Sequence, residues 1–272
     1  MKHQIRTAIL AAAIATLVAA CATTTSSTGR TQRVGAVSQQ QLDQMGAQAF
    51  AEARAKGTLS TDAGQNAYVR CVVSALVREL PAQDRAIAWE TAVFADKEPN
   101  AFALPGGKVG VHTGIMRVAT NQDQLAAVLA HEIGHVVENH HNERITGQVG
   151  AQTLLGIAGA LLGSRYGQGA ADATTQIGGA AAQGLFLLPN SRTQELEADV
   201  VGQRLMAQAG FDPGQAVNLW QNMIAAGGGR QPEWLSTHPD PQSRIQELRN
   251  LASSLAPAYQ QARASGRVPR CG

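Results

Sequence analysis

The stretch His131-Glu132-Ile133-Gly134-His135 has residue types and a spacing that suit hydrolysis. Histidines four positions apart project from one face of a helix, so both imidazole rings can bind one metal ion. Glu132 lies beside them, where its carboxylate can take a proton from water. The pattern therefore predicts a zinc site with His131 and His135 as ligands and Glu132 as the catalytic base.

A catalytic zinc ion needs three protein ligands and one open position. The segment Glu195-Leu196-Glu197-Ala198-Asp199 offers carboxylates on a predicted helix, where Glu195 and Asp199 share a face and Glu197 points away. We expect Glu195 to be the third ligand and Asp199 to accept the ring N–H of a ligating histidine. For this segment taken alone, a solvated acidic helix face is the alternative.

The remaining histidines and the tryptophans give weaker signals. We expect surface or structural roles, rather than metal binding, for His112, His140 and His141. The tryptophans are most simply interpreted as packing residues of the core (Trp89, Trp220 and Trp234). The predicted site therefore depends on the segments 131–135 and 195–199.

Helices around a small sheet are predicted to position these residues. Ser or Asn followed three positions later by Gln opens three of the helical patterns, and alternating apolar residues predict short strands. The expected helices are 38–57, 62–80, 122–142, 191–210, 213–227 and one from 241, and the expected strands are 86–94 and 108–113. We predict a mainly helical α+β fold, in which one uninterrupted helix, 122–142, carries the metal motif. The Gly- and Ala-rich residues 146–184 are expected to form a mobile, partly helical cover.

The composition of the 272-residue chain is that of a globular protein with one main domain, since 44% of its residues are hydrophobic and 15% are charged. The formal net charge is +2 and falls to zero without Lys2 and Arg6. No basic run is long enough to follow a phosphate backbone. Nucleic acid is therefore not expected as a partner.

The N-terminus has the pattern of a signal peptide, because Lys2 and Arg6 precede the apolar run Thr7–Ala20. That run is too short for a stable transmembrane helix. It ends in a pattern similar to a bacterial lipobox, so we expect residues 1–20 to be removed and Cys21 to carry a lipid. An ordinary signal peptide, with Cys21 incidental, is the alternative.

The segment after the predicted lipidation site is rich in Thr, Ser and Gly. We expect residues 21–37 to be a flexible tether and residues 38–272 to be the catalytic domain. Ala22, rather than an acidic residue, follows the cysteine, which favours a location in the outer membrane facing the periplasm.

Cys71 and Cys271 remain in the exported chain. An oxidising compartment favours a disulfide between them, and two free thiols are the alternative.

Five short motifs occur in order between about Gln39 and Leu251. They are Asn100–Gly107, Thr113-Gly114, His131–Val136, Ser191-Arg192 with Glu195 and Asp199, and His238-Pro239 with Arg244. Together they resemble the family of zinc metallopeptidases that includes the CAAX prenyl endopeptidase, HtpX, BepA and LoiP. Because no transmembrane helix is predicted, the chain looks more like the lipoprotein members, LoiP above all.

The resemblance implies a zincin-type, gluzincin-like fold with one zinc ion per chain, held by His131, His135 and Glu195. It also implies that His238 lies at the zinc, either as a plug in the fourth position or as a donor to the oxyanion. The hairpin would provide an edge strand along which an extended, unfolded substrate pairs (Phe102, Lys108, Val109, Gly110 and Val111).

The predicted function is that of a zinc metalloendopeptidase of the bacterial cell envelope. Its substrates would be misfolded or unassembled envelope proteins, and the outer-membrane assembly machinery would be a further partner. One alternative is a chaperone-like scaffold of outer-membrane assembly that seldom cleaves, but a scaffold has no need of Glu132. Another is a zinc amidase acting on peptidoglycan, which the edge-strand motif argues against.

Overall fold

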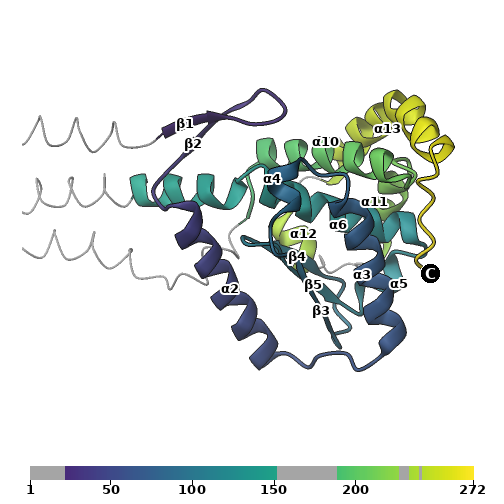
Figure 1. Ribbon diagram of the computed structural model, residues 1–272, viewed down its shortest axis with the longest axis horizontal. Coiled ribbons are helices and arrows are strands. Elements are labelled where there is room, and N and C mark those ends of the chain that lie inside the picture. The colour runs from purple at the N-terminus through teal and green to yellow at the C-terminus, as the bar shows by residue number, and fades with distance from the viewer. Residues whose placement is uncertain (1–21, 152–188, 227–232, 239–240) are drawn as a thin grey trace, which may run out of the picture.

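The computed structural model describes residues 22–151, 189–226, 233–238 and 241–272 (Figure 1). Helices dominate and a small three-stranded sheet lies against them, which confirms the predicted mainly helical class with a small sheet. The predicted signal peptide, Cys21 and most of the predicted cover, from residue 152 onward, lie outside the described residues. The lipid on Cys21 and the domain boundaries stay predictions.

A pair of strands at the start of the described chain and a group of three strands further on are separated and followed by helices. The helices are α2 (Gln39–Lys56), α3 (Ala63–Val77), α4 (Ala82–Arg85), α5 (Ile115–Val118), α6 (Gln122–Val137), α10 (Arg192–Ala209), α11 (Gln215–Ala226), α12 (Glu233–Thr237) and α13 (Pro241–Ala264). The strands are β1 (Ala22–Thr25), β2 (Thr31–Val34), β3 (Glu90–Phe94), β4 (Ala101–Leu104) and β5 (Lys108–His112).

Side-chain caps fix where the two helices of the predicted site begin. Ser191 forms the predicted capping box with Gln194 at the start of α10. At the start of α6, Asn121 accepts a hydrogen bond from the backbone N–H of Gln124. The Gln124 side chain accepts from the backbone N–H of Thr120 at 2.9 Å instead of returning to Asn121, so only half of that capping box forms.

The order of strands in the sheet shows that the predicted edge strand is wrong. The order is β3-β5-β4, with β5 parallel to β3 and antiparallel to β4. Because β3 pairs with β5, four of the predicted edge residues lie on the central strand, bonded on both sides (Lys108, Val109, Gly110 and Val111). Of the two edge strands, β3 is partly bonded to residues 58–60, whereas β4, which contains Phe102, has no such partner within the described residues. The ring of Phe102 covers Gly110, where a Cβ atom would lie 2.1 Å from it.

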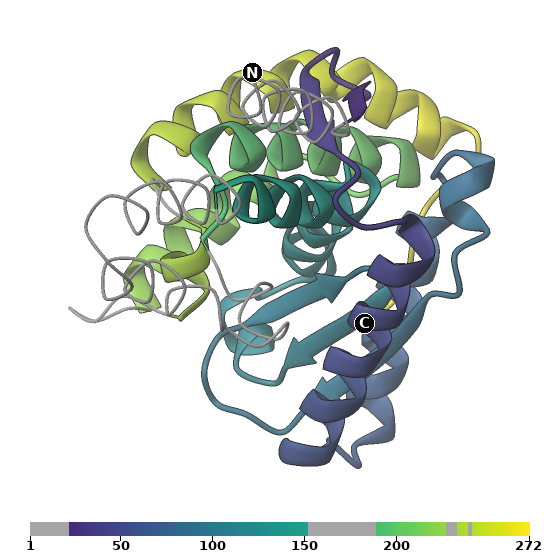
Figure 2. The same ribbon diagram turned by 90° about the vertical axis from the view of Figure 1, so that its left-hand side faces the viewer.

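The helix α6 is the centre of the molecule, and its residues from Gln124 to Val136 are all buried. Figure 2 shows α13, α10, α6 and the sheet as successive layers, and α10 contacts both α6 and α13. The surrounding side chains of α3, α11 and the sheet form one apolar core with α6. None of the helices in the described part of the chain is long and apolar enough to cross a membrane.

The helix that carries the metal motif is shorter than predicted. It ends at Val137, and a second helix covers residues 140–151 of the described chain. Between them Asn139 has φ of 55°, in the left-handed region that Asn adopts more readily than most residues. This turn changes the direction of the chain, so His140 does not continue the face of α6.

Residues 22–34 do not form the predicted flexible tether. Strands β1 and β2 pair in antiparallel register from Ala22 with Val34 to Thr25 with Thr31, and the hairpin lies beside α10 (Figure 1). Its buried Gln32 side chain donates to the Glu138 carbonyl at 2.6 Å. Specific side-chain contacts of this kind order the segment.

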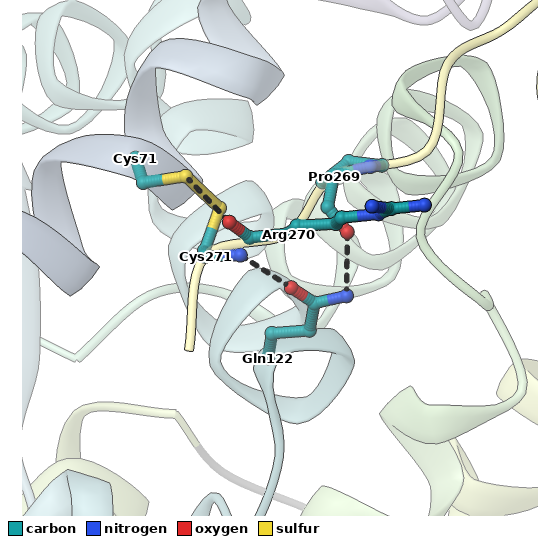
Figure 3. Close-up of a disulfide and its surroundings, with 5 residues drawn as sticks. All are labelled: Cys71, Gln122, Pro269, Arg270 and Cys271. Atoms are coloured by element: carbon teal, nitrogen blue, oxygen red, sulfur yellow. Dashed lines mark hydrogen bonds between the residues drawn. A yellow bond between two sulfur atoms is a disulfide. The ribbon is translucent and has the colours of Figure 1, made fainter.

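Cys71 in α3 and Cys271 form a disulfide, as predicted, with their Cα atoms 5.4 Å apart (Figure 3). Gln122, in the first turn of α6, holds the same tail. Its side chain donates to the Pro269 carbonyl at 2.9 Å and accepts from the Cys271 N–H at 2.9 Å. The C-terminal tail is therefore attached to both α3 and α6.

Replacing both cysteines, Cys71→Ser with Cys271→Ser, is expected to lower the free energy of unfolding by about 2–4 kcal/mol, because the disulfide restricts the unfolded chain. Metal affinity should not change, since His131 lies about 14 Å along α6 from Gln122. Urea unfolding without reductant measures the first effect. An unchanged unfolding midpoint, or two free thiols in wild-type protein purified under oxidising conditions, would contradict the prediction.

Candidate metal centre

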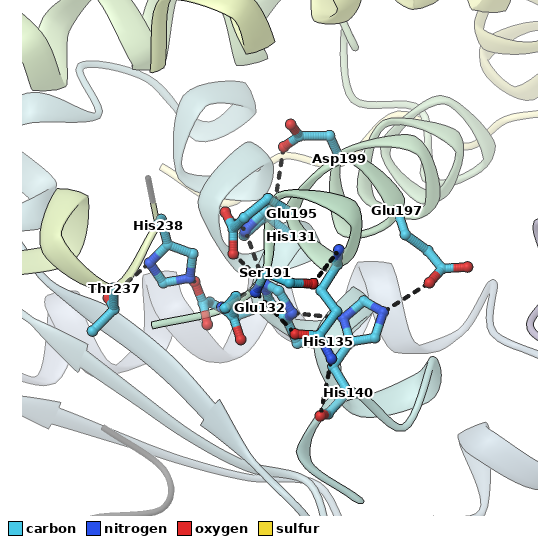
Figure 4. Close-up of polar contacts among 12 residues, drawn as sticks. His131, Glu132, His135, His140, Ser191, Glu195, Glu197, Asp199, Thr237 and His238 are labelled. Atoms are coloured by element: carbon cyan, nitrogen blue, oxygen red, sulfur yellow. Dashed lines mark hydrogen bonds and ion pairs between the residues drawn. The ribbon is translucent and has the colours of Figure 1, made fainter. Parts of the chain in front are cut away.

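Three residues of α6 and α10 meet in a buried cluster (Figure 4). The Nε2 atoms of His131 and His135 are 3.1 Å apart. The Oε2 of Glu195 lies 3.5 Å from the Nε2 of His131, and its Oε1 lies 3.4 Å from the Nε2 of His135. The structure thus brings together the three side chains predicted to be metal ligands.

Close packing of α10 on α6 produces this arrangement. A Cβ atom at Gly202 would lie 2.9 Å from the backbone N of His131, and one at Gly134 would lie 3.2 Å from the Ala198 carbonyl oxygen. Without side chains at these two positions, the helix backbones approach closely. Glu195 then lies one turn from the contact, opposite the two histidines.

His238, directly after α12, completes the cluster. One ligand atom from each of His131, His135, Glu195 and His238 lies within 4.8 Å of the others, and all four residues are buried. The Nδ1 of His238 lies 2.9 Å from the Trp234 carbonyl oxygen, so its Nε2 faces the cluster. His238 therefore lies near the ligands, where the sequence predicted it, and its role stays a prediction.

The cluster suits a metal cation. Within the described residues, the Oε1 of Glu195 and the Nε2 of His238 are buried and have no hydrogen-bond partner, an arrangement that is costly unless another group binds them. Two imidazole nitrogens and a carboxylate, with a fourth position beside them, are the donor set of catalytic zinc sites. The residues present therefore fit a zinc ion.

The charges of the cluster also favour a cation. Burial would raise the pKa of Glu195, but the charge of His238 and the hydrogen bonds of His131 and His135 hold it well below its ordinary value. Burial would lower the pKa of His131, but Asp199 and Glu195 raise it to about 9. Two carboxylates thus stabilise positive charge at this point.

Asp199 contacts the ring of His131, at the place where a supporting carboxylate is expected. Its Oδ1 accepts from the His131 Nδ1 at 3.0 Å, and Arg244 donates to both Asp199 oxygens at 2.7 Å. Arg244 is fully buried, also binds Glu195, and lies 4.1 Å from the ring centroid of Trp220. The sequence singled out Arg244 only as part of a motif, and its role in holding both carboxylates was missed.

His135 is supported by His140, for which only a surface or structural role was expected. Its Nδ1 lies 2.7 Å from the Nδ1 of His140, whose Nε2 lies 3.0 Å from the Oε2 of Glu197. His140 is fully buried and is structural rather than a ligand, and Glu197 points away from the ligand cluster, as expected. The break at Asn139 places His140 here, and no periodic signal in the sequence could show it.

Glu132 is held beside the cluster by a tryptophan. The indole N–H of Trp234 donates to the Glu132 Oε1 at 2.9 Å, and the His238 Nε2 is 3.3 Å from the same oxygen. Trp234 was expected to be only a core residue. Burial would raise the pKa of Glu132, but the charges of His238 and His131 and the Trp234 hydrogen bond lower it, so the carboxylate is ionised.

A cleft of about 260 Å³ opens beside the cluster. Glu132, His135 and His238 line it together with residues 100–104, which include β4. The free edge of β4 therefore borders the cleft that contains the predicted catalytic base.

The fold and the site define a zincin-like metallopeptidase. The sequence model of Peptidase family M48 matches residues 63–252, which is more than half of the chain. The chain therefore belongs to peptidase family M48, and the predicted family is confirmed.

Named relatives agree with this assignment. The mitochondrial metalloendopeptidase OMA1 of Schizosaccharomyces pombe is 41% identical over 164 residues, or 60% of this chain and 46% of that protein. The β-barrel assembly-enhancing protease of Escherichia coli K12 is 34% identical over 170 residues, or 59% of this chain and 34% of that protein. The OMA1 metalloendopeptidase of Danio rerio is 30% identical over 221 residues, or 78% of this chain and 46% of that protein. Each match covers less than half of the relative, and the names support the predicted class of enzyme, a metalloendopeptidase.

The predicted location is contradicted by these relatives. The OMA1 proteins of S. pombe and D. rerio are named mitochondrial, so membership of this family does not place a chain in a bacterial outer membrane. The prediction depended on a short pattern ending at Cys21 and on the residue after it. We therefore withdraw the outer-membrane, periplasm-facing location.

Wild-type protein is expected to bind one zinc ion per chain, and Glu195→Ala should lose most of it, because the change removes the one carboxylate of the four-residue cluster and leaves the Arg244 cation beside the histidines. Metal analysis after dialysis measures the occupancy. Glu247→Ala, an exposed change on α13, is the control and should keep the wild-type content. Wild-type occupancy in Glu195→Ala would show that another group is the third ligand.

Proposed function

We propose that this chain is a zinc-dependent metalloendopeptidase that cleaves unfolded or unassembled proteins in membrane-protein quality control. The observation that carries the proposal is the placement of Glu132 between the buried ligand cluster and the cleft that β4 borders. The relatives' names, which include an endopeptidase and a protease that enhances β-barrel assembly, support a protein substrate.

His131, His135 and Glu195 would hold the zinc ion, which supplies Lewis-acid activation of water and of the scissile carbonyl. The ionised carboxylate of Glu132 takes the proton from water and then passes it to the nitrogen of the leaving amine. The hydrogen bond from Trp234 to one oxygen fixes the direction of the carboxylate, so the proton transfer needs little reorganisation. The chaperone-like scaffold remains the competing proposal, and it has no use for this arrangement.

The free edge of β4 is the proposed binding surface for substrate. An extended peptide can pair with Ala101–Leu104 by backbone hydrogen bonds, as an added strand does. Such pairing recognises the backbone rather than particular side chains, and it requires a chain whose own hydrogen bonds are open. Unfolded segments therefore fit the cleft better than folded proteins.

His238 is proposed to act as a fourth ligand that holds the enzyme inactive. The Nδ1 of His238 lies 2.9 Å from the Trp234 carbonyl oxygen, which can only accept, and 2.9 Å from the Thr237 hydroxyl. These contacts direct the Nε2 toward the cluster, where its lone pair could bind a metal ion once the ring is neutral. Donation to an oxyanion would instead require a hydrogen on Nε2, so the two roles differ in the protonation of this one atom.

Glu132→Gln is expected to keep the zinc ion and to lower casein cleavage by at least about 10²-fold, because an amide keeps the shape of the side chain but cannot take a proton. Casein hydrolysis with and without a chelator, alongside metal analysis, tests this. The exposed change Glu247→Gln should cleave at the wild-type rate. If wild type and Glu132→Gln are equally inactive while zinc is bound, the scaffold gains support; equal and substantial turnover would refute the mechanism.

His238→Ala is expected to raise the initial rate of casein cleavage, because removal of the plug opens the fourth position. The zinc content should stay at one per chain, since three ligands remain. A fall in kcat by about 10²–10³ would assign the oxyanion role instead. Unaltered kinetics would exclude both roles.

A further inference from the structure

The loop between β1 and β2 contacts the residues that support the metal ligand His135, and it does not line the cleft. Arg30, in this loop, contacts carboxylates on two different helices. Its Nε lies 2.6 Å from Glu197 of α10, and its Nη1 and Nη2 lie 2.7 and 2.8 Å from the two oxygens of Glu143. Ser26 and Thr28 also donate to Glu197. Three residues of the loop thus converge on one buried carboxylate.

Glu197 fixes the hydrogen positions of two imidazole rings. Because the carboxylate accepts, the Nε2 of His140 carries the hydrogen, and its Nδ1 presents a lone pair. That lone pair accepts from the Nδ1–H of His135 at 2.7 Å. The Nε2 of His135 is then left without a hydrogen and faces Glu195 and His131, as a metal ligand must.

We propose that Arg30 is a positioning residue for the metal ligand His135, and that it acts through Glu197 and His140. The guanidinium joins Glu143 and Glu197, two carboxylates that would repel each other without it. Its removal leaves Glu197 with the hydroxyls of Ser26 and Thr28 but without its cation, so the acceptor that orients His140 is held less firmly. The proposal rests on the proposed function in one respect, since it requires a metal ion at the cluster.

The hairpin has other attachments that do not involve Arg30. The backbone N–H of Ser27 donates to the Glu138 side chain at 2.9 Å, and the Gln32 side chain donates to the Glu138 carbonyl at 2.6 Å. Beyond the hairpin, the backbone N–H of Gly35 donates to Asn142 at 3.2 Å. These contacts should keep the segment docked when Arg30 is replaced, so the effect of the replacement is local.

The first test measures zinc affinity by competition with a chromophoric chelator. Arg30→Ala is expected to weaken zinc binding by about 10-fold, the lower end of the range for groups that support metal ligands. Arg30→Lys should recover part of the loss, because an ammonium keeps the charge but lacks the fork that joins two carboxylates. Arg33→Ala, an exposed arginine on the same hairpin, should bind zinc as the wild type does.

The second test asks whether Arg30 acts by the proposed route. In a His140→Phe or Glu197→Gln background, Arg30→Ala should cause little further loss of zinc affinity, because the intermediate group is already gone. The visible absorption of the Co²⁺-substituted protein should change in Arg30→Ala and stay unchanged in Arg33→Ala, since it reports the ligand geometry. Using two backgrounds keeps the test available if one variant does not fold.

Two results would overturn the positioning role. One is wild-type zinc affinity in an Arg30→Ala protein whose circular dichroism shows a folded chain. The other is a loss of zinc affinity on Arg30→Ala that is equally large in the wild type and in the His140→Phe and Glu197→Gln backgrounds. Neither measurement uses peptide hydrolysis, so the test of Arg30 is independent of the test of the proposed function. If zinc binding depends on Arg30 but the protein has no peptidase activity, the proposed function is refuted and the role of Arg30 stands.

Discussion

The close crossing of α10 over α6 is the contact on which the site depends. It is set by the backbone, because Gly134 and Gly202 lie where any Cβ atom would press on Ala198 or His131. A larger separation would move Glu195 away from both histidines together. Apolar side chains of the surrounding helices and the sheet pack around α6, so the metal cluster lies on a deeply buried helix.

Burial of so many ionisable groups requires that each be paired. The structure meets this with two arginines, each paired with two carboxylates. Arg244 neutralises Asp199 and Glu195 behind His131, and Arg30 neutralises Glu197 and Glu143 behind His135. Each ligand ring thus has its own carboxylate and its own cation, and the two halves of the network reach the metal cluster from different parts of the chain.

The sequence predicted what depends on helix periodicity and missed what depends on tertiary contact. Spacing within each helix paired His131 with His135 and Glu195 with Asp199, and the family resemblance related the two segments. In an unbroken helix His140 would lie about 140° around the axis from His135, since each residue turns by about 100°. The left-handed turn at Asn139 brings the two rings together instead. Likewise the hairpin sequence could not tell that β3 pairs with β5 and leaves the free edge to β4.

The four residues of the cluster differ in how firmly the fold holds them. Three lie on the long helices α6 and α10, whereas His238 directly follows the five-residue helix α12. The Nδ1 of His238 bonds to Trp234, whose indole holds Glu132, so one short segment positions both the proposed plug and the proposed base. A displacement of α12 would therefore alter the fourth ligand position and the orientation of Glu132 together, while leaving His131, His135 and Glu195 on the rigid crossing. The geometry thus separates retention of the metal, which depends on the core, from readiness for catalysis, which depends on α12.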